Sequence, residues 1–219
     1  MTTDHSKEGK QTTPPPWLTW ARALQALSQT GLHFTDNPYE RDRYEQIGVI
    51  AAEMLAQHTT MPVHDVLAMH AKEHGYATPK VDVRGAVFRD DKILLVRETL
   101  DNGRWTLPGG WADVNETPAQ AVVREIREEA GFDATVTKVI AVYDRDAQGH
   151  TPLMPYHVYK LFFLCALTGG APCDSHETSG AAFFAEDALP ELSHSRVTPQ
   201  ELRRCFAHSR QPSLATDCD

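Results

Sequence analysis

The period of the hydrophobic pattern changes at residues 76–80, and this change constrains the fold more than any other feature of the chain. Before it, apolar residues recur every three or four positions, which predicts helices. After it, apolar and polar residues alternate over 81–88, which predicts a strand. We therefore expect a helical domain at 17–75, a linker at 76–80 and a second domain at 81–208.

Three helices are predicted in the first domain. The first begins at Trp17 and ends near Gly31, the second follows Asn37-Pro38 and reaches His58, and the third follows Pro62 and stops before Gly75. Residues 1–16, which end in three prolines, are expected to form a disordered tail.

The predicted helices carry more apolar surface than three short helices can bury alone, although Trp17 and Trp20 are expected to pack in the core. Symmetric pairing of two copies is the commonest way to cover such a surface. We therefore expect a homodimer in which the N-terminal helices take part. The apolar residues concerned are Trp17, Trp20, Leu24, Leu27, Ile47, Ile50 and Leu55.

The second domain is predicted to be α/β, with a mixed sheet and helices on its faces. Strands are found on both sides of a helical segment without regular alternation of strand and helix. The strand patterns fall at 81–88, 93–97, 135–143, 157–167 and 180–185, and the helical patterns at 117–130 and 199–209. Residues 209–219 are expected to form a second tail.

Charge and composition exclude several classes of protein. The net charge is −9, and neither part of the chain is basic, which argues against a broad nucleic-acid surface. No apolar run approaches the roughly 18 residues that a membrane span needs, and residues 1–11 lack the apolar core of a signal peptide. The four cysteines contain no C-x-x-C pair. A cytoplasmic protein without a membrane partner is expected.

The segment 107–132 combines a glycine loop with a helix of two faces. Pro108-Gly109-Gly110 favours a tight turn and a close approach of the backbone to a ligand. Thr117-Pro118 predicts a helix start, and Gly131 predicts its end.

Three glutamates, Glu125, Glu128 and Glu129, fall together on the polar side of that helix. They repel one another by roughly 0.2–0.5 kcal/mol per pair, and two of them lie at the negative end of the helix dipole. One interpretation is a solvated acidic face paired with Arg124 and Arg127. The other is a site for a hard divalent cation, Mg²⁺ or Mn²⁺, which prefers oxygen ligands. The adjoining Pro-Gly-Gly loop favours the cation site.

This segment resembles the Nudix box, G-x5-E-x7-R-E-U-x-E-E-x-G-U, in which U is a bulky apolar residue. Nine positions match within 23 residues, the last with Phe instead of the usual aliphatic residue: Gly110, Glu116, Arg124, Glu125, Ile126, Glu128, Glu129, Gly131 and Phe132. The resemblance implies the Nudix fold, an α/β/α sandwich around a mixed sheet. It also implies hydrolysis of a nucleoside diphosphate linked to another moiety X.

The resemblance further implies a role for each matched residue. Glu125 and Glu129 would hold the metal, joined by Glu128 and the carbonyl of Gly109. Arg124 would orient the glutamates, and Glu116 would brace the loop against the helix. Gly110 and Gly131 would support the site structurally.

The general base and the substrate contacts are left with alternatives. In Nudix enzymes the base is a box glutamate, here Glu128, or an acid from a later loop, here Glu177. Arg84 and Arg97 alternate outward on facing strands and are candidates for phosphate contacts. Trp111 is a candidate for stacking on a base or enclosing a quaternary ammonium.

The N-terminal helices resemble a Nudix branch whose members are CDP-choline pyrophosphatases or are labelled ADP-ribose pyrophosphatases. The segments that carry this likeness include WLTWARALQALSQTGLHF and NPYERDRYEQIGVIAAEML. Nudix enzymes of the ADP-ribose type have a proline about 15–16 residues after the box. In this chain that proline is displaced, which favours a CDP-alcohol such as CDP-choline as the substrate. The alternatives are ADP-ribose or a sugar nucleotide, RNA-end processing, and a non-catalytic nucleotide-binding regulator.

Overall fold

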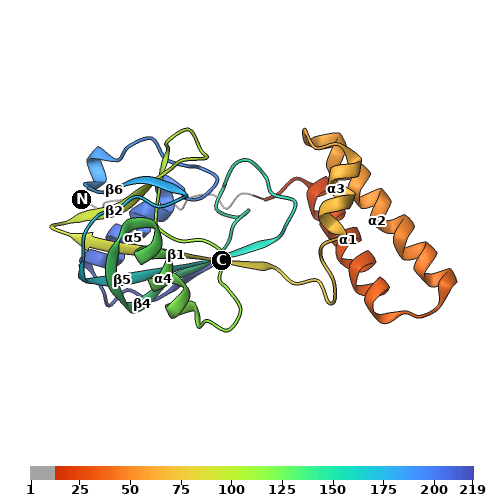
Figure 1. The fold of residues 1–219 in the computed structure, drawn as a ribbon, viewed down its shortest axis with the longest axis horizontal. Helices are drawn as coiled ribbons and strands as arrows, with labels where there is room; N and C mark the ends of the chain where they lie inside the picture. Colours follow the sequence, from red (N-terminus) through yellow and green to blue (C-terminus); the bar gives the residue numbers. More distant parts are fainter. Residues whose placement is uncertain (1–12) are drawn as a thin grey trace, which may run out of the picture. The chain divides into compact units, whose positions relative to one another are not determined.

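The computed structural model describes residues 13–219, which form two compact units (Figure 1). One unit contains residues 13–80 and 154–157, and the other contains residues 81–153 and 158–219. The first 12 residues of the tail expected at 1–16 lie outside the described residues. In residues 13–219 we find no helix that is long and apolar enough to cross a membrane.

The helical unit consists of α1 (Pro16–Phe34), α2 (Pro38–His58) and α3 (Val63–His70), in agreement with the three predicted helices. Proline in the first turn fixes the start of α1 and of α2. The side chain of Asn37 accepts a hydrogen bond from the Tyr39 N–H, as the predicted N-cap requires. A Cβ added to Gly31 would lie 2.3 Å from the Tyr44 ring, so glycine permits the close packing of α1 on α2.

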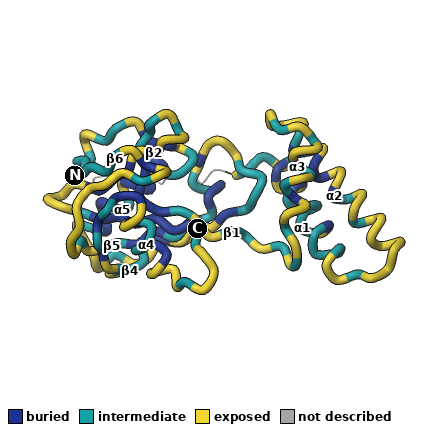
Figure 2. The backbone as a smooth tube through the Cα atoms, viewed as in Figure 1, coloured by how far each residue is buried: buried dark blue, intermediate teal, exposed yellow. Residues whose placement is uncertain are grey.

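The core of the helical unit is small. Its buried members are Leu18, Ala21, Ala52, Leu55 and Val66. Trp17 stacks on His58 at its edge, with ring centroids 4.3 Å apart. Trp20, which the sequence predicts in the core, is 61% exposed instead. Figure 2 shows exposed positions along the helices of this unit.

The second unit is built on a seven-stranded mixed sheet. Its order is β3-β2-β1-β5-β4-β7, with β6 paired to β2. Most neighbouring strands are antiparallel, and β4 and β7 are parallel. The strands are β1 (Lys80–Arg89), β2 (Lys92–Glu98), β3 (Trp105–Thr106), β4 (Phe132–Asp144), β5 (Val158–Gly170), β6 (Thr178–Phe184) and β7 (Asp217–Cys218).

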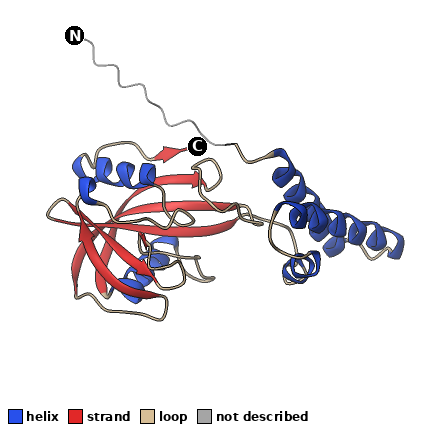
Figure 3. Cartoon of the chain, turned by 90° about the horizontal axis from the view of Figure 1, so that it is seen from above, coloured by secondary structure: helices blue, strands red, loops and turns tan. Residues whose placement is uncertain are grey.

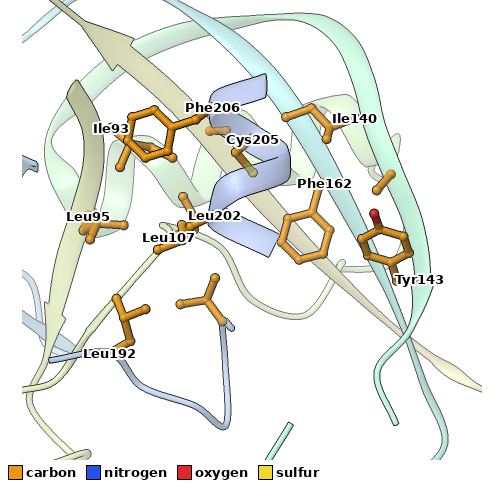
Figure 4. Packing of buried hydrophobic residues seen from close by; sticks show 13 residues of the cluster. Ile93, Leu95, Leu107, Ile140, Tyr143, Phe162, Leu192, Leu202, Cys205 and Phe206 are labelled. Atoms are coloured by element: carbon orange, nitrogen blue, oxygen red, sulfur yellow. The ribbon is translucent and has the colours of Figure 1, made fainter. Parts of the chain in front are cut away.

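Two helices cover the sheet, as predicted, and each packs on its own core (Figure 3). α4 (Pro118–Ala130) buries Val122 and Ile126 against β1 residues such as Val83. α5 (Pro199–Arg210) points Leu202, Cys205 and Phe206 at the other cluster, which includes Ile93, Leu95 and Phe162 (Figure 4). A short 3₁₀ helix, η1 (Glu186–Ala188), follows β6.

The last residues correct the expected tail at 209–219. α5 continues to Arg210, and β7 adds to the sheet beside β4. Arg204 and Tyr143 both bond to the Asp217 carboxylate, which holds this segment in place. Neither β7 nor β3 has enough residues to show a period, so the sequence pattern misses both.

Candidate active site

The glycine loop lies against β1 because the backbone N–H groups of two alternate residues of that strand bind it. The Val83 N–H donates to the Gly110 carbonyl at 2.8 Å, and the Gly85 N–H donates to the Pro108 carbonyl at 2.9 Å. Gly109 has a φ of 143°, and a Cβ there would lie 2.0 Å from the Val83 carbonyl oxygen. Only glycine therefore fits this position without a shift of the backbone.

α4 begins and ends where local rules predict. Thr117 caps its first turn in a reciprocal capping box with Gln120. Gly131 ends it in the left-handed conformation, with φ 75°. These two fixed ends set which residues of α4 face the glycine loop.

Glu129 is the most buried of the three glutamates and bonds directly to the loop. It is 6% exposed, and its Oε2 accepts a 2.8 Å hydrogen bond from the Gly109 N–H. Burial raises the pKa of Glu129 to about 8, although the charge of Arg84 and the bond from Gly109 act in the opposite direction. A buried carboxylate of this kind is suited to a cation, which would replace the lost solvation.

Arg124 gathers the other acids of the segment. Its Nε donates to both oxygens of Glu116, at 3.0 and 3.1 Å. Its Nη1 donates to Glu125 at 2.8 Å and to Glu128 at 3.0 Å. Burial raises the pKa of Glu125, and Arg124 opposes this effect. Arg127 instead pairs with Asp133 at 3.4 Å, outside this group.

The carboxylates do not all meet at one point. Within residues 13–219, no three acidic, imidazole or thiol side chains are placed so that together they could hold a metal ion. The physical reason is that Arg124 holds Glu125 and Glu128, while Gly109 holds Glu129. The donor set still fits a hard divalent cation in its chemistry, because it consists of carboxylate oxygens and includes one that is buried.

Glu98, at the end of β2, belongs to the same region, although the sequence pattern does not predict it. It is 3% exposed and forms a 2.9 Å ion pair with Arg196. Burial raises its pKa, against the charges of Arg196 and Arg84, and Glu177 adds to the rise. A lone glutamate after an apolar strand carries no local signal, because Arg196 lies almost 100 residues away along the chain.

Glu177 lies immediately before β6, close to the last turn of α4. Its carbonyl accepts a 2.9 Å hydrogen bond from the Thr99 N–H, beside Glu98. The following residue, Thr178, donates through Oγ1 to the Glu129 carbonyl at 2.6 Å. The loop candidate for the base is thus brought near the box, although 46 residues separate it from Gly131.

The expected substrate contacts have different outcomes. Arg84 does not point outward as predicted: it is 4% exposed, because Asp82 and the Leu107 carbonyl bind its guanidinium. Arg97 is exposed and donates to the Gly103 carbonyl at 3.1 Å. Trp111 pairs with Asp82 through the backbone and is 44% exposed, so its indole is accessible.

Fold and site together define a class of hydrolase, in which a glycine loop on a mixed sheet leads into an acidic helix. The family model described as the NUDIX domain matches residues 78–204, and the chain belongs to this family of hydrolases. A second model, described as a UDP-X-like N-terminal oligomerisation domain, matches residues 15–69.

Two of the relatives described here cover 93% of the chain, and a third covers 65% of it. A putative ADP-ribose pyrophosphatase, YjhB, from Bacillus subtilis is 43% identical over 93% of this chain and 97% of its own. The crystal structure of a UDP-X diphosphatase has a TM-score of 0.60 and 33% identity over 93% of this chain and 98% of that one. The crystal structure of an ADP-ribose pyrophosphatase from Streptococcus suis has a TM-score of 0.59 and 41% identity. It covers 65% of this chain and 100% of its own.

Proposed function

We propose that this hydrolase cleaves the pyrophosphate bond of a nucleoside diphosphate linked to X, giving a nucleoside monophosphate and a phosphorylated X. The observation that carries the proposal is the hydrogen bond from the Gly109 N–H to Glu129. This bond connects the glycine loop to a buried carboxylate of the acidic helix. The cofactor proposed is Mg²⁺ or Mn²⁺, held by Glu125, Glu128, Glu129 and the carbonyl of Gly109.

Different residues of the site are proposed to have different roles in this reaction. A bound divalent cation would neutralise the diphosphate and polarise it for attack by water. Arg124 orients Glu125 and Glu128 through its Nη1. Glu116 anchors that guanidinium from the other side, and thereby ties the loop before α4 to the helix.

Two carboxylates are proposed as alternatives for the base that takes the proton from water. Glu128 is favoured by its place on α4 and by a side chain that is 60% exposed. Glu177 is favoured by its place beside Glu98. Glu128→Gln and Glu177→Gln should be compared for kcat at several pH values. The base is the residue whose loss removes the acidic limb of the pH profile.

The substrate proposed first is a CDP-alcohol such as CDP-choline, and ADP-ribose or a sugar nucleotide is the alternative. The accessible indole of Trp111 beside the glycine loop supports the first, since aromatic faces attract quaternary ammonium groups. The names of the relatives in B. subtilis and S. suis support the second. RNA-end processing and a non-catalytic regulatory role lack an observation of this kind.

A substrate panel tests the proposal. CDP-choline, ADP-ribose, a UDP-sugar and a short 5′-triphosphorylated RNA would be incubated with Mg²⁺ or Mn²⁺, and nucleotide products separated by chromatography. Glu129→Gln is the matched control for contaminating activity. We expect the highest kcat/KM with CDP-choline. A tenfold preference for ADP-ribose would establish the alternative, and no hydrolysis above the control would refute the enzyme assignment.

The N-terminal helices are proposed to form a homodimer interface. Trp20, Leu27 and Phe34 recur every seven residues on α1 and are 61%, 59% and 71% exposed. Ile50 on α2 is 49% exposed. A spacing of seven residues places side chains on one stripe of a helix, as in coiled coils formed by helices of two chains. The description of the matching N-terminal model supports oligomerisation through this part of the chain.

A further inference from the structure

Three buried charged side chains lie together beneath the glycine loop. Asp82 and Arg84 come from β1, where their spacing of two places them on one face of the sheet, and Lys160 comes from the neighbouring β5. Their exposures are 6%, 4% and 1%. Charges so deeply buried require close partners, which these three residues supply to one another.

Asp82 is the centre of this cluster. The Arg84 guanidinium donates to both of its oxygens, from Nε at 2.9 Å and from Nη2 at 2.7 Å. The Lys160 ammonium donates to Oδ1 at 2.8 Å. Burial alone would raise the pKa of Asp82, but the two cations hold it well below its usual value. The carboxylate is therefore charged and bound on both sides.

Arg84 extends the cluster to the glycine loop. Its Nη1 donates a 3.1 Å hydrogen bond to the carbonyl of Leu107, the residue before Pro108. Two residues further on, the Gly109 N–H meets Glu129. An unbroken series of contacts thus runs from Lys160 in β5 to the proposed metal ligand in α4.

The shape of the arginine side chain explains why this series can hold a fixed geometry. A guanidinium is planar, so two parallel bonds to one carboxylate fix its orientation as well as its position. The direction of the third hydrogen bond, from Nη1 of Arg84 to the Leu107 carbonyl, is then fixed as well. A lysine at position 84 would keep the positive charge but would lose this fork.

We propose that Arg84, Asp82 and Lys160 are positioning residues of the hydrolytic site. Lys160 holds Asp82, Asp82 fixes the guanidinium plane of Arg84, and Arg84 holds the Leu107 carbonyl so that Gly109 faces Glu129. This inference rests on the proposed function of the loop. It assigns Arg84 a task beneath the loop in place of the phosphate contact expected from the sequence.

Three variants test the proposal. Arg84→Lys keeps the charge and removes the fork. Lys160→Met keeps the length of the side chain and removes the ammonium, while Asp82 stays bonded to Arg84. Arg89→Lys is the matched control, because Arg89 is an exposed residue of β1 that lies over the rings of Phe132 and Phe183.

Each variant would be measured in three ways, after circular dichroism has established its fold. The first is amide hydrogen exchange over residues 107–111 in metal-free protein. The second is Mn²⁺ affinity by electron paramagnetic resonance, without substrate. The third is kcat and KM with the best substrate of the panel.

For Arg84→Lys we expect faster exchange at Gly109, Mn²⁺ affinity about tenfold weaker and kcat reduced about tenfold or more, with KM within about twofold. Lys160→Met should shift the same quantities less, and Arg89→Lys should leave them unchanged. A cluster that serves stability alone would lower the melting temperature and leave Mn²⁺ affinity and kcat of the folded protein intact.

Wild-type exchange and Mn²⁺ affinity in folded Arg84→Lys and Lys160→Met would overturn the proposal. Loss of the fold in both variants at 25 °C would overturn it too, since the cluster would then be a stability element. If the wild-type protein hydrolyses nothing in the panel, the proposed function fails. Exchange and Mn²⁺ affinity still report on positioning in that case.

Discussion

The backbone N–H of Gly109 donates a 2.8 Å hydrogen bond to Oε2 of Glu129, 20 residues further along the chain. This bond joins the glycine loop to the last turn of α4. It also stabilises the negative charge of Glu129, which burial opposes. The buried charge of this carboxylate therefore lowers the stability of the metal-free protein but favours the binding of a cation. The two effects can be measured separately.

The first prediction concerns the stability of the metal-free protein. Glu129 has a pKa of about 8 when folded and an ordinary value of 4.5, so the folded state holds the extra proton between these values. The free energy of unfolding should therefore fall as the pH rises from about 5 to about 8. Glu129→Gln removes this contribution, and its melting temperature should change less over the same range. Calorimetry with a chelator present measures both slopes.

Glu128→Gln is the control for that comparison, because the Glu128 side chain is 60% exposed. It should change the slope of the wild-type protein less than Glu129→Gln does. Glu125 and Glu98 also have raised pKa values and contribute to the total slope, so the difference between variants is the quantity to use. Equal slopes in Glu129→Gln and in wild type would remove Glu129 from this role.

The second prediction concerns metal dependence. A chelator in excess should abolish hydrolysis, and Mg²⁺ or Mn²⁺ should restore it. Glu125→Gln and Glu129→Gln should each lower kcat/KM by about 10²-fold or more, with the fold retained. Because Glu129 must lose its proton to bind a cation, Mn²⁺ affinity should increase with pH up to about 8. Full activity in chelator, or pH-independent affinity, would contradict this prediction.

The third prediction concerns the glycine loop. Gly109→Ala places a Cβ 2.0 Å from the Val83 carbonyl oxygen and should reduce the free energy of unfolding by about 3 kcal/mol. Gly180→Ala is a matched control in the same unit, with φ 151° against 143°, and its nearest contact is 3.9 Å away at Trp105. This variant has the same backbone strain without the clash, so it should reduce the free energy of unfolding by less than Gly109→Ala does. Urea denaturation compares the two, and equal losses would mean that strain alone matters.

Local rules explain which parts of this site the sequence predicts. The ends of α4 follow from Thr117 and Gly131, because capping and the left-handed conformation involve only neighbouring residues. Glu116 and Arg124 also lie within one segment, and the structure brings them into contact. The burial of Arg84 could not be predicted in this way, since its partner Asp82 is stabilised by Lys160 from a strand 78 residues away. Glu98 was missed for the same reason.

The last prediction concerns assembly. The stripe of Trp20, Leu27 and Phe34 should bury itself against a second copy, since exposed apolar patches of this kind mark interaction sites. Light scattering should give twice the 24.4 kDa of one chain. Leu27→Glu places a charge in the stripe and should shift the protein to the mass of one chain. Leu100→Glu makes the same substitution at a residue that is 88% exposed in the other unit, and should keep the dimer. A wild-type mass of 24.4 kDa would end the dimer claim, and a dimeric Leu27→Glu would exclude this face of α1.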